Sequence, residues 1–193
     1  MSISNYINWA HMNNRYAFVG VDAGTWQVLS MDTPKSVPLV SANGIDLVPA
    51  DPHAAPPPSS WVLHGLISNV RYATRSEITA LRSTQAPLGR PAARKAALIP
   101  IKKSAAWWDL AQDERRAIFE DASHHTAVGL EYLPAIARQL FHCRDIAQPF
   151  DFLTWLEYAP EHASTFEALV DRLRSTTEWT YVEREIDIRL ERP

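Results

Sequence analysis

The stretch of chain between residues 103 and 143 collects side chains that could build one chemical site. It holds an adjacent tryptophan pair, Trp107 and Trp108, then His125, and then Arg138. A neutral imidazole is a common protein ligand for haem iron. A guanidinium is always charged and can hold a small anion, and an indole combines a large apolar ring with one hydrogen-bond donor. Together these residue types would suit a buried cofactor that acts on an anionic substrate.

Each of these residues also has a purely structural explanation. The adjacent His124 and His125 are typical of partly exposed residues at the start of a helix, since histidine has intermediate burial. Arg138 could form a surface ion pair, although its neighbours in the chain are mostly apolar. Zinc is a weaker alternative, because His142 and Cys143 lack the paired ligand spacing of structural zinc sites.

The spacing between His125 and Arg138 does not by itself bring them to one cofactor. The apolar pattern predicts a helix over about residues 126–142, interrupted by Pro134. In one straight helix, their thirteen-residue separation would place the two side chains about 20 Å apart on nearly opposite faces. Pro134 would permit a bend between them.

Composition excludes several classes of protein. The chain has 193 residues, enough for a substantial core, and a formal net charge of −3, which offers no basic stripe for nucleic acid. No apolar run is long enough for a membrane helix, and the first twenty residues lack the apolar stretch of a signal peptide. Cys143 is the single cysteine, so no internal disulfide can form. We therefore expect a cytoplasmic protein without membrane or nucleic-acid partners.

The elements that must position the candidate residues alternate between strands and helices. We expect a flexible N-terminus over 1–15 and a proline-rich loop over 31–60. Alternating or short apolar segments predict strands, and apolar stripes at helical spacing predict helices. The predicted strands are 16–21, 26–29, 61–70, 98–101, 150–158 and 179–190, and the predicted helices include 76–84 and the segment after Pro160. This order indicates an α+β fold, in which helices cover one side of an antiparallel sheet.

The candidate residues and the strand after them resemble the chlorite dismutase family. The family pattern is a lysine, a tryptophan pair, an axial histidine, an arginine thirteen residues later, and a strand with phenylalanine, threonine and glutamate. The matching residues here are Lys103, Trp107-Trp108, His125, Arg138-Gln-Leu140-Phe141-His142 and Phe152-Leu-Thr154-Trp-Leu156-Glu157. The match covers about residues 98–190, and the short first half resembles the compact, dimeric branch of the family.

The resemblance implies a fold and a cofactor. Together with the element order, it implies two ferredoxin-like halves, 16–97 and 98–193, in a dimeric α+β barrel whose second half binds haem b. It further implies that His125 is the axial iron ligand and Arg138 the catalytic residue on the opposite side of the haem. Glu178 would accept a hydrogen bond from the axial imidazole, and Lys103 would bind that carboxylate.

Other cofactor contacts are implied in the same way. Residues of the distal pocket would be Leu140, Thr154 and Leu156, while Trp107 and Trp108 would pack near the haem edge or its propionates. Asn69 and Tyr72 could donate hydrogen bonds to the propionates.

The implied activity is the conversion of chlorite to chloride and dioxygen, through ferryl haem and hypochlorite, by a homodimer. Two alternatives stay open: peroxide-dependent decarboxylation of coproheme, in which a distal arginine is usually absent, and a non-catalytic haem-binding protein. Hypochlorite could oxidise tryptophans 107, 108, 155 or 179, which the sequence alone does not rank.

Overall fold

The computed structural model describes residues 14–35, 37–51, 58–67 and 71–193. Most of the predicted flexible N-terminus and Asn69 therefore lie outside the described residues. The strands are β1 (Arg15–Val21), β2 (Trp26–Asp32), β3 (Gly44–Pro49), β4 (Trp61–Leu66), β5 (Lys95–Lys103), β6 (Ile136–His142), β7 (Phe152–Tyr158), β8 (Val182–Glu185) and β9 (Asp187–Glu191).

The helical segments lie mainly in the second half of the chain. They are α1 (Arg75–Thr84), α2 (Ala105–Asp109), α3 (Gln112–Arg116), the π-helical turn η1 (Ala117–Ala122), α4 (His125–Tyr132), α5 (Ala163–Arg174) and the short 3-10 turns η2 (Arg144–Ile146), η3 (Pro160–His162) and η4 (Thr177–Tyr181).

The strands form one antiparallel sheet that closes on itself. Its order is β7-β6-β4-β1-β3-β2-β9-β5-β8, and β5 pairs with β7 as well as with β8 and β9. This extra pairing makes β5 the strand that closes a barrel. The barrel interior is filled by large apolar side chains, among them Phe18, Trp26, Phe141 and Trp155.

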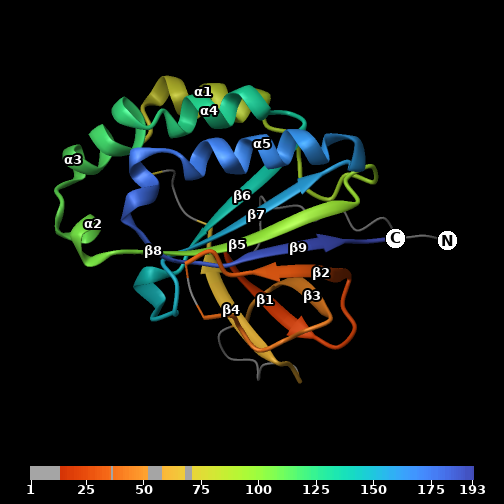
Figure 1. Cartoon of the computed structure of the whole chain (residues 1–193). Helices are drawn as coiled ribbons and strands as arrows, with labels where there is room; N and C mark the ends of the chain where they lie inside the picture. Colours follow the sequence, from red (N-terminus) through yellow and green to blue (C-terminus); the bar gives the residue numbers. More distant parts are fainter. Residues whose placement is uncertain (1–13, 36, 52–57, 68–70) are drawn as a thin grey trace.

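Both halves of the chain arrange their strands in the same order, with β8 and β9, which pair with consecutive parts of β5, together taking the place of the last strand of the second half. The first half runs β4-β1-β3-β2 and the second runs β9-β5-β7-β6, so both place their fourth, first, third and second strands side by side. This is the ferredoxin-like order, and the α+β prediction is confirmed. In the second half helices connect β5 to β6 and β7 to β8, whereas the corresponding connections of the first half, 22–25 and 50–60, are shorter. The helices therefore cover one side of the barrel (Figure 1).

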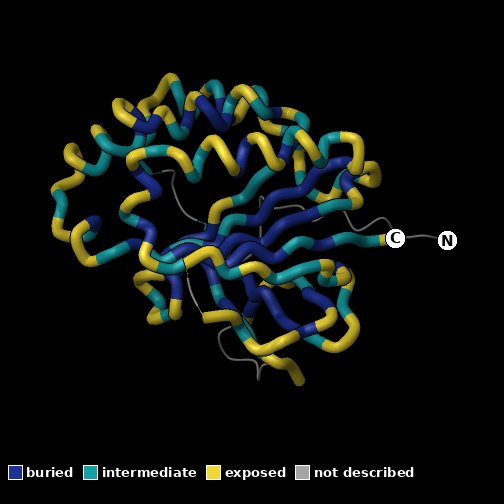
Figure 2. The backbone as a smooth tube through the Cα atoms, in the orientation of Figure 1, coloured by how far each residue is buried: buried dark blue, intermediate teal, exposed yellow. Residues whose placement is uncertain are grey.

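Strand β7 shows why one face of the sheet meets the helices. Leu153 and Trp155 point into the barrel core, and Leu156 and Tyr158 point to a second apolar cluster shared with α4 and α5. The predicted alternation of this strand is confirmed, and Phe150, which precedes the strand, packs in the barrel core instead. The burial colours follow this division, with buried strands beneath helices whose outer sides are exposed (Figure 2).

The helix predicted over residues 126–142 is wrong beyond its first two turns. Helix α4 ends at Tyr132, because Pro134 disfavours helical backbone in the residue before it. The chain then enters β6, which pairs with β7 from Ile136 to His142. Arg138 consequently lies on a strand, and the distance calculated along a helix does not apply to it.

The loop predicted over residues 31–60 is also wrong in part. Strand β2 continues to Asp32, and Gly44–Pro49 forms β3, which pairs with β1 along its whole length. Ile45 and Leu47 from this strand pack in or against the barrel core. Burial of these alternating side chains therefore outweighs the prolines on both sides of the strand. Among the described residues, no helix is long and apolar enough to cross a membrane.

The packing between β4 and β6 gives a test of the barrel. A Cβ atom at Gly65 would lie 2.5 Å from Cβ of Phe141, which is fully buried. We expect Gly65→Ala to lower the free energy of unfolding by about 1–3 kcal/mol, because overpacking a rigid core forces side chains and backbone to shift. Urea denaturation would measure this loss, with the exposed Ser83→Ala as control. Equal stability of the variant and the wild type would show that the two strands do not pack this closely.

Candidate active site

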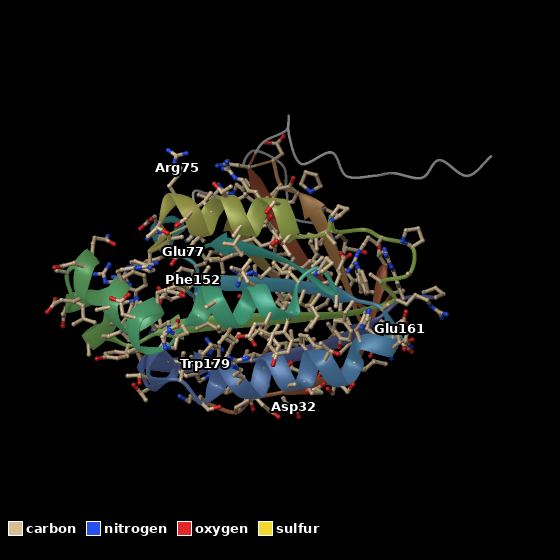
Figure 3. All side chains as sticks on the ribbon, turned by 90° about the horizontal axis from the view of Figure 1, so that it is seen from above. Asp32, Arg75, Glu77, Phe152, Glu161 and Trp179 are labelled. Atoms are coloured by element: carbon tan, nitrogen blue, oxygen red, sulfur yellow. The ribbon has the colours of Figure 1, made fainter. Side chains whose placement is uncertain are left out.

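A cavity of about 550 Å³ lies between the sheet and the helix layer. Its walls come from β5, β6 and β7 on one side and from α1, α4 and α5 on the other. Seen from above, these three helices run side by side, with Phe152 and Trp179 toward the same end of the molecule (Figure 3). The walls are largely apolar and include Ile99, Ile101 and Val170. A cavity of this size and lining is typical of a cofactor or ligand site.

Three charged or polar side chains from separate elements meet at one end of this cavity. His125 begins α4, Lys103 ends β5, and Glu178 lies in η4. The Nδ1 atom of His125 is 2.6 Å from Oε2 of Glu178, and the Nζ atom of Lys103 is 2.6 Å from Oε1 of the same carboxylate. Lys103 and Glu178 are almost completely buried. One carboxylate therefore joins the imidazole to a buried ammonium group.

The surrounding backbone holds these residues in place. The backbone N–H of Glu178 donates to Oγ of Ser123, just before the histidine pair. The buried carboxylate of Glu120 accepts hydrogen bonds from the backbone N–H groups of Thr126 and Ala127, at 2.7 Å and 3.2 Å. It thereby satisfies free donors in the first turn of α4, which stabilises the helix start that carries His125.

The charge state of Glu178 follows from these partners. Burial alone would raise the pKa of Glu178, but the charges and hydrogen bonds of His125 and Lys103 lower it to about 2. For Lys103, burial lowers the pKa, and the attraction of Glu178 opposes that effect. The carboxylate is therefore ionised at neutral pH and accepts hydrogen bonds from both neighbours.

Arg138 enters the same cavity from the sheet. It lies opposite Leu156 in the β6–β7 register and reaches toward α4, where a Cβ atom at Gly129 would be 3.7 Å from Cζ of the guanidinium. Gly129 is four residues after His125 and so lies on the same helix face. Burial lowers the pKa of Arg138, although a guanidinium remains charged in proteins. In the described part of the chain this guanidinium has no carboxylate partner.

Most of the other predicted site residues also line the cavity. Leu140 lies opposite Thr154 in the β6–β7 register, one alternating position along from Arg138 and Leu156. Trp107 is buried and lines the cavity. Trp108 does not: its indole N–H donates to Asp151, and its ring stacks with Phe152.

Three buried polar atoms around the cavity have no hydrogen-bond partner among the described residues. They are the hydroxyl of Tyr72, Nε1 of Trp107 and Nδ1 of His142. Buried polar groups are normally satisfied, so unpaired donors that border an apolar cavity indicate a polar part of a bound group. An apolar group with a polar edge and an atom that accepts an imidazole ligand fits this lining, and haem has these properties.

Sequence reasoning missed several cavity residues. Phe119, whose ring stacks on His125 at 4.3 Å, lines the cavity, and Glu120 lies outside the lining but holds the start of α4. Both belong to a segment whose charged residues are typical of a solvated helix. No sequence signal marks them. Gly129 was detectable, because it follows His125 at helical spacing.

Cys143 is buried with its pKa raised by burial to about 12, and no cluster of three metal-ligating side chains occurs among the described residues.

Comparison with known proteins agrees with this geometry. The family model described as chlorite dismutase matches residues 57–191. The chain belongs to the chlorite dismutase family. A curated chlorite dismutase from Ideonella dechloratans is 35% identical over 66 residues, which are 34% of this chain and 22% of that protein. The matched segment thus spans less than a quarter of that relative.

Solved structures of chlorite dismutases extend the similarity. A dimeric chlorite dismutase from Nitrobacter winogradskyi is 57% identical, with a TM-score of 0.86 over 92% of this chain and 99% of that chain. A chlorite dismutase from Candidatus Nitrospira defluvii, in complex with imidazole, is 29% identical, with a TM-score of 0.57 over 69% of this chain and 55% of that chain. The family similarity therefore covers nearly the whole chain.

The low pKa of Glu178 predicts how acid affects stability. Its pKa in the folded protein, about 2, lies below the ordinary value of 4.5. The ionised carboxylate therefore adds stability above pH 4.5, and this contribution is lost as the pH falls through 2. We expect Glu178→Gln to lower the free energy of unfolding by about 3–5 kcal/mol at neutral pH, because it leaves Lys103 buried without a counter-charge.

Urea denaturation of the cofactor-free protein across this pH range would measure the effect. The difference between wild type and Glu178→Gln should shrink as the pH falls from 4.5 to 2. Glu161→Gln, at an exposed position, serves as control. A difference that stays constant to the lowest pH would contradict the ion-pair account.

Proposed function

We propose that this chain binds haem b in the cavity and converts chlorite to chloride and dioxygen. The observation that carries the proposal is that His125 and Arg138 line one cavity from opposite walls, helix α4 and strand β6. Family membership supports the same reaction. An imidazole ligand on one side and a free guanidinium on the other would separate iron binding from anion binding.

The apolar walls and the free Nε2 atom of His125 would hold the haem. The unpaired donors of Tyr72 and Trp107, whose rings lie 5.9 Å apart, would bind its propionates. Trp108 would support this end indirectly, through its hydrogen bond to Asp151, which also accepts the backbone N–H of Lys103. When bound, haem iron supplies oxygen-atom transfer, a reaction for which the side chains have no equivalent.

Glu178 and Lys103 would set the properties of the axial histidine. A carboxylate that accepts the Nδ1 proton fixes the imidazole tautomer, directs Nε2 toward the cavity and raises the basicity of the ring. Lys103 keeps this carboxylate ionised by holding its other oxygen. The buried position of the pair excludes water that would otherwise compete for both oxygens.

Arg138 would bind chlorite as a counter-ion and retain hypochlorite until its oxygen is used. The reaction divides one ClO₂⁻ into Cl⁻ and O₂, so it requires no net proton transfer and no external reductant. The guanidinium has no described carboxylate to release before it binds an anion. Leu156, which is buried beside it, would limit water, which strengthens the attraction between the two charges.

The two alternatives from the sequence are less well supported. Coproheme decarboxylases usually lack the distal arginine that Arg138 would supply, and a passive haem carrier would not require a guanidinium in its pocket. We further propose a homodimer, because the Nitrobacter winogradskyi relative is a dimeric chlorite dismutase. A cytoplasmic location stays a prediction from the sequence.

Haem binding can be tested apart from turnover. Haemin titrated into the cofactor-free protein should give a Soret band, and His125→Ala should weaken or shift it, because the axial imidazole is lost. His124→Asn is the matched control, since His124 is exposed with φ of 52°, a conformation that asparagine tolerates. If His124→Asn alters the spectrum and His125→Ala does not, the ligand assignment is wrong.

The role of Arg138 can be tested with chlorite. We expect Arg138→Ala to lower kcat roughly 10- to 100-fold, a loss of about 1.4–2.7 kcal/mol of transition-state stabilisation. Chlorination of a trap dye should rise, because hypochlorite escapes from the cavity. An oxygen electrode and dye absorbance would record both effects, with the exposed Arg75→Ala as control. Normal oxygen yield without added chlorination would refute this role.

A further inference from the structure

The indole N–H groups of the tryptophans around the cavity have different partners. The N–H of Trp107 has none among the described residues, and the ammonium of Lys103 lies 4.7 Å from its ring centre. Trp108 donates to Asp151, but the guanidinium carbons of Arg115 and Arg144 lie 5.1 Å and 4.0 Å from its ring centre. A nearby cation disfavours loss of an electron from an indole ring, because it repels the positive charge that forms.

Trp155 and Trp179 each donate to a buried carboxylate. The N–H of Trp155 lies 2.9 Å from Oε1 of Glu157, and that of Trp179 lies 2.9 Å from Oε2 of Glu185. Trp155, however, packs inside the barrel core and does not line the cavity. Trp179 does line it, directly after Glu178 in the chain, and the ammonium of Lys103 lies 5.8 Å from its ring centre, farther than the 4.7 Å at Trp107. Of these four indoles, only Trp179 combines contact with the cavity and a carboxylate that can accept its proton.

Glu185 is itself held by an ion-pair network. Its carboxylate is 1% exposed, and Nε of Arg174 donates to Oε1 at 2.8 Å. Arg174 also binds Asp187, which in turn binds Arg189. The carboxylate therefore keeps a fixed orientation toward the indole N–H.

Trp179 and Glu185 also border a second hollow, of about 240 Å³, so both side chains line the cavity and this hollow. This hollow lies at the protein surface, since Pro34, Lys35 and Thr180 in its wall are exposed. The ammonium of Lys35 donates to the carbonyls of Trp179 and Val182, at 3.0 Å and 3.2 Å, and forms no ion pair with a described carboxylate. The hollow thus presents positive charge next to the indole. The same indole therefore lies in the walls of both the cavity and the surface hollow.

We propose that Trp179 is an electron relay between the surface hollow and the cofactor cavity, with Glu185 as the acceptor of its indole proton and a small reducing anion as the electron donor. This inference rests on the proposed binding of haem in the cavity. The relay would return an oxidised cofactor site to its resting state when the chlorite cycle is interrupted.

The electrons and protons balance with a peroxyacid as oxidant. The peroxyacid takes two electrons from the protein and two protons from solvent, and it leaves as a carboxylic acid and water. Trp179 supplies one of these electrons and passes its indole proton to Glu185, while the cofactor site supplies the other. A reducing anion such as ascorbate then returns one electron to the ring and releases its own proton to solvent. A second such anion, acting through the same ring, returns the electron that the cofactor site supplied. The proton on Glu185 goes back to the indole nitrogen.

The test uses haem-loaded protein that carries ring-deuterated tryptophan. After rapid mixing with peracetic acid and freezing, electron paramagnetic resonance should show an organic radical whose line is narrower than in unlabelled protein. Trp179→Phe should abolish this signal, and Trp155→Phe, in which the indole removed also donates to a carboxylate, should retain it. In Glu185→Gln the amide oxygen can still accept the hydrogen bond from the indole N–H, but it cannot take up the proton. The yield of neutral radical should therefore fall roughly tenfold, which corresponds to about 1.4 kcal/mol less favourable proton transfer.

The donor side is tested by the decay of the same radical. Added ascorbate should remove it faster, and Lys35→Gln should slow that removal roughly threefold, because it takes one positive charge from the hollow. Soret spectra and oxygen release from chlorite are recorded for every variant. If the wild type binds no haem, the proposed function fails. If it binds haem and releases oxygen but the radical survives in Trp179→Phe, only the relay is overturned.

Discussion

The buried interaction of Lys103, Glu178 and His125 is the constraint on which the rest of the site depends. An ammonium and a carboxylate with almost no exposure to solvent are stable only when each satisfies the other, since desolvation otherwise costs several kcal/mol. The three residues come from the end of β5, the turn η4 and the start of α4. A single carboxylate thus fixes the position of the helix layer relative to the sheet, at the point where the imidazole enters the cavity.

The unequal halves of the barrel explain why there is a cavity on one side. Both halves have the same strand order, and among the described residues the helices in crossover connections belong to the second half. Those helices rest on the outer face of β5, β6 and β7, whose alternate residues fill the barrel core. The space between these layers is bordered by strand side chains on one side and by α4 on the other. A charged residue on β6 and an imidazole on α4 can therefore face one bound group.

The sequence predicts the parts of this arrangement that have a local signal. Strand β7 was predictable because Leu153 and Trp155 alternate with Thr154 and Leu156, and the motif spacing identified His125 and Arg138. The structure of the segment around Arg138 was not predictable, because its apolar neighbours fit a helix as well as a strand. Pairing with β7 decides between them. Lys103 and Glu178 are 75 residues apart. Their buried ion pair forms only when the chain folds, so the sequence contains no local signal for it.

Strand β5 combines two tasks that are usually separate. It closes the barrel through its pairs with β7, β8 and β9, and its last residue holds Glu178. Any fluctuation in the pairing of β5 with its neighbouring strands would therefore move Lys103 and change the hydrogen bond between Glu178 and the imidazole of His125. The vibrational or optical spectrum of a bound cofactor would then depend on the strand pairing of β5, although β5 contributes no ligand to the cofactor. The absorption spectrum of the bound cofactor would therefore change when the strand pairing of the barrel is distorted.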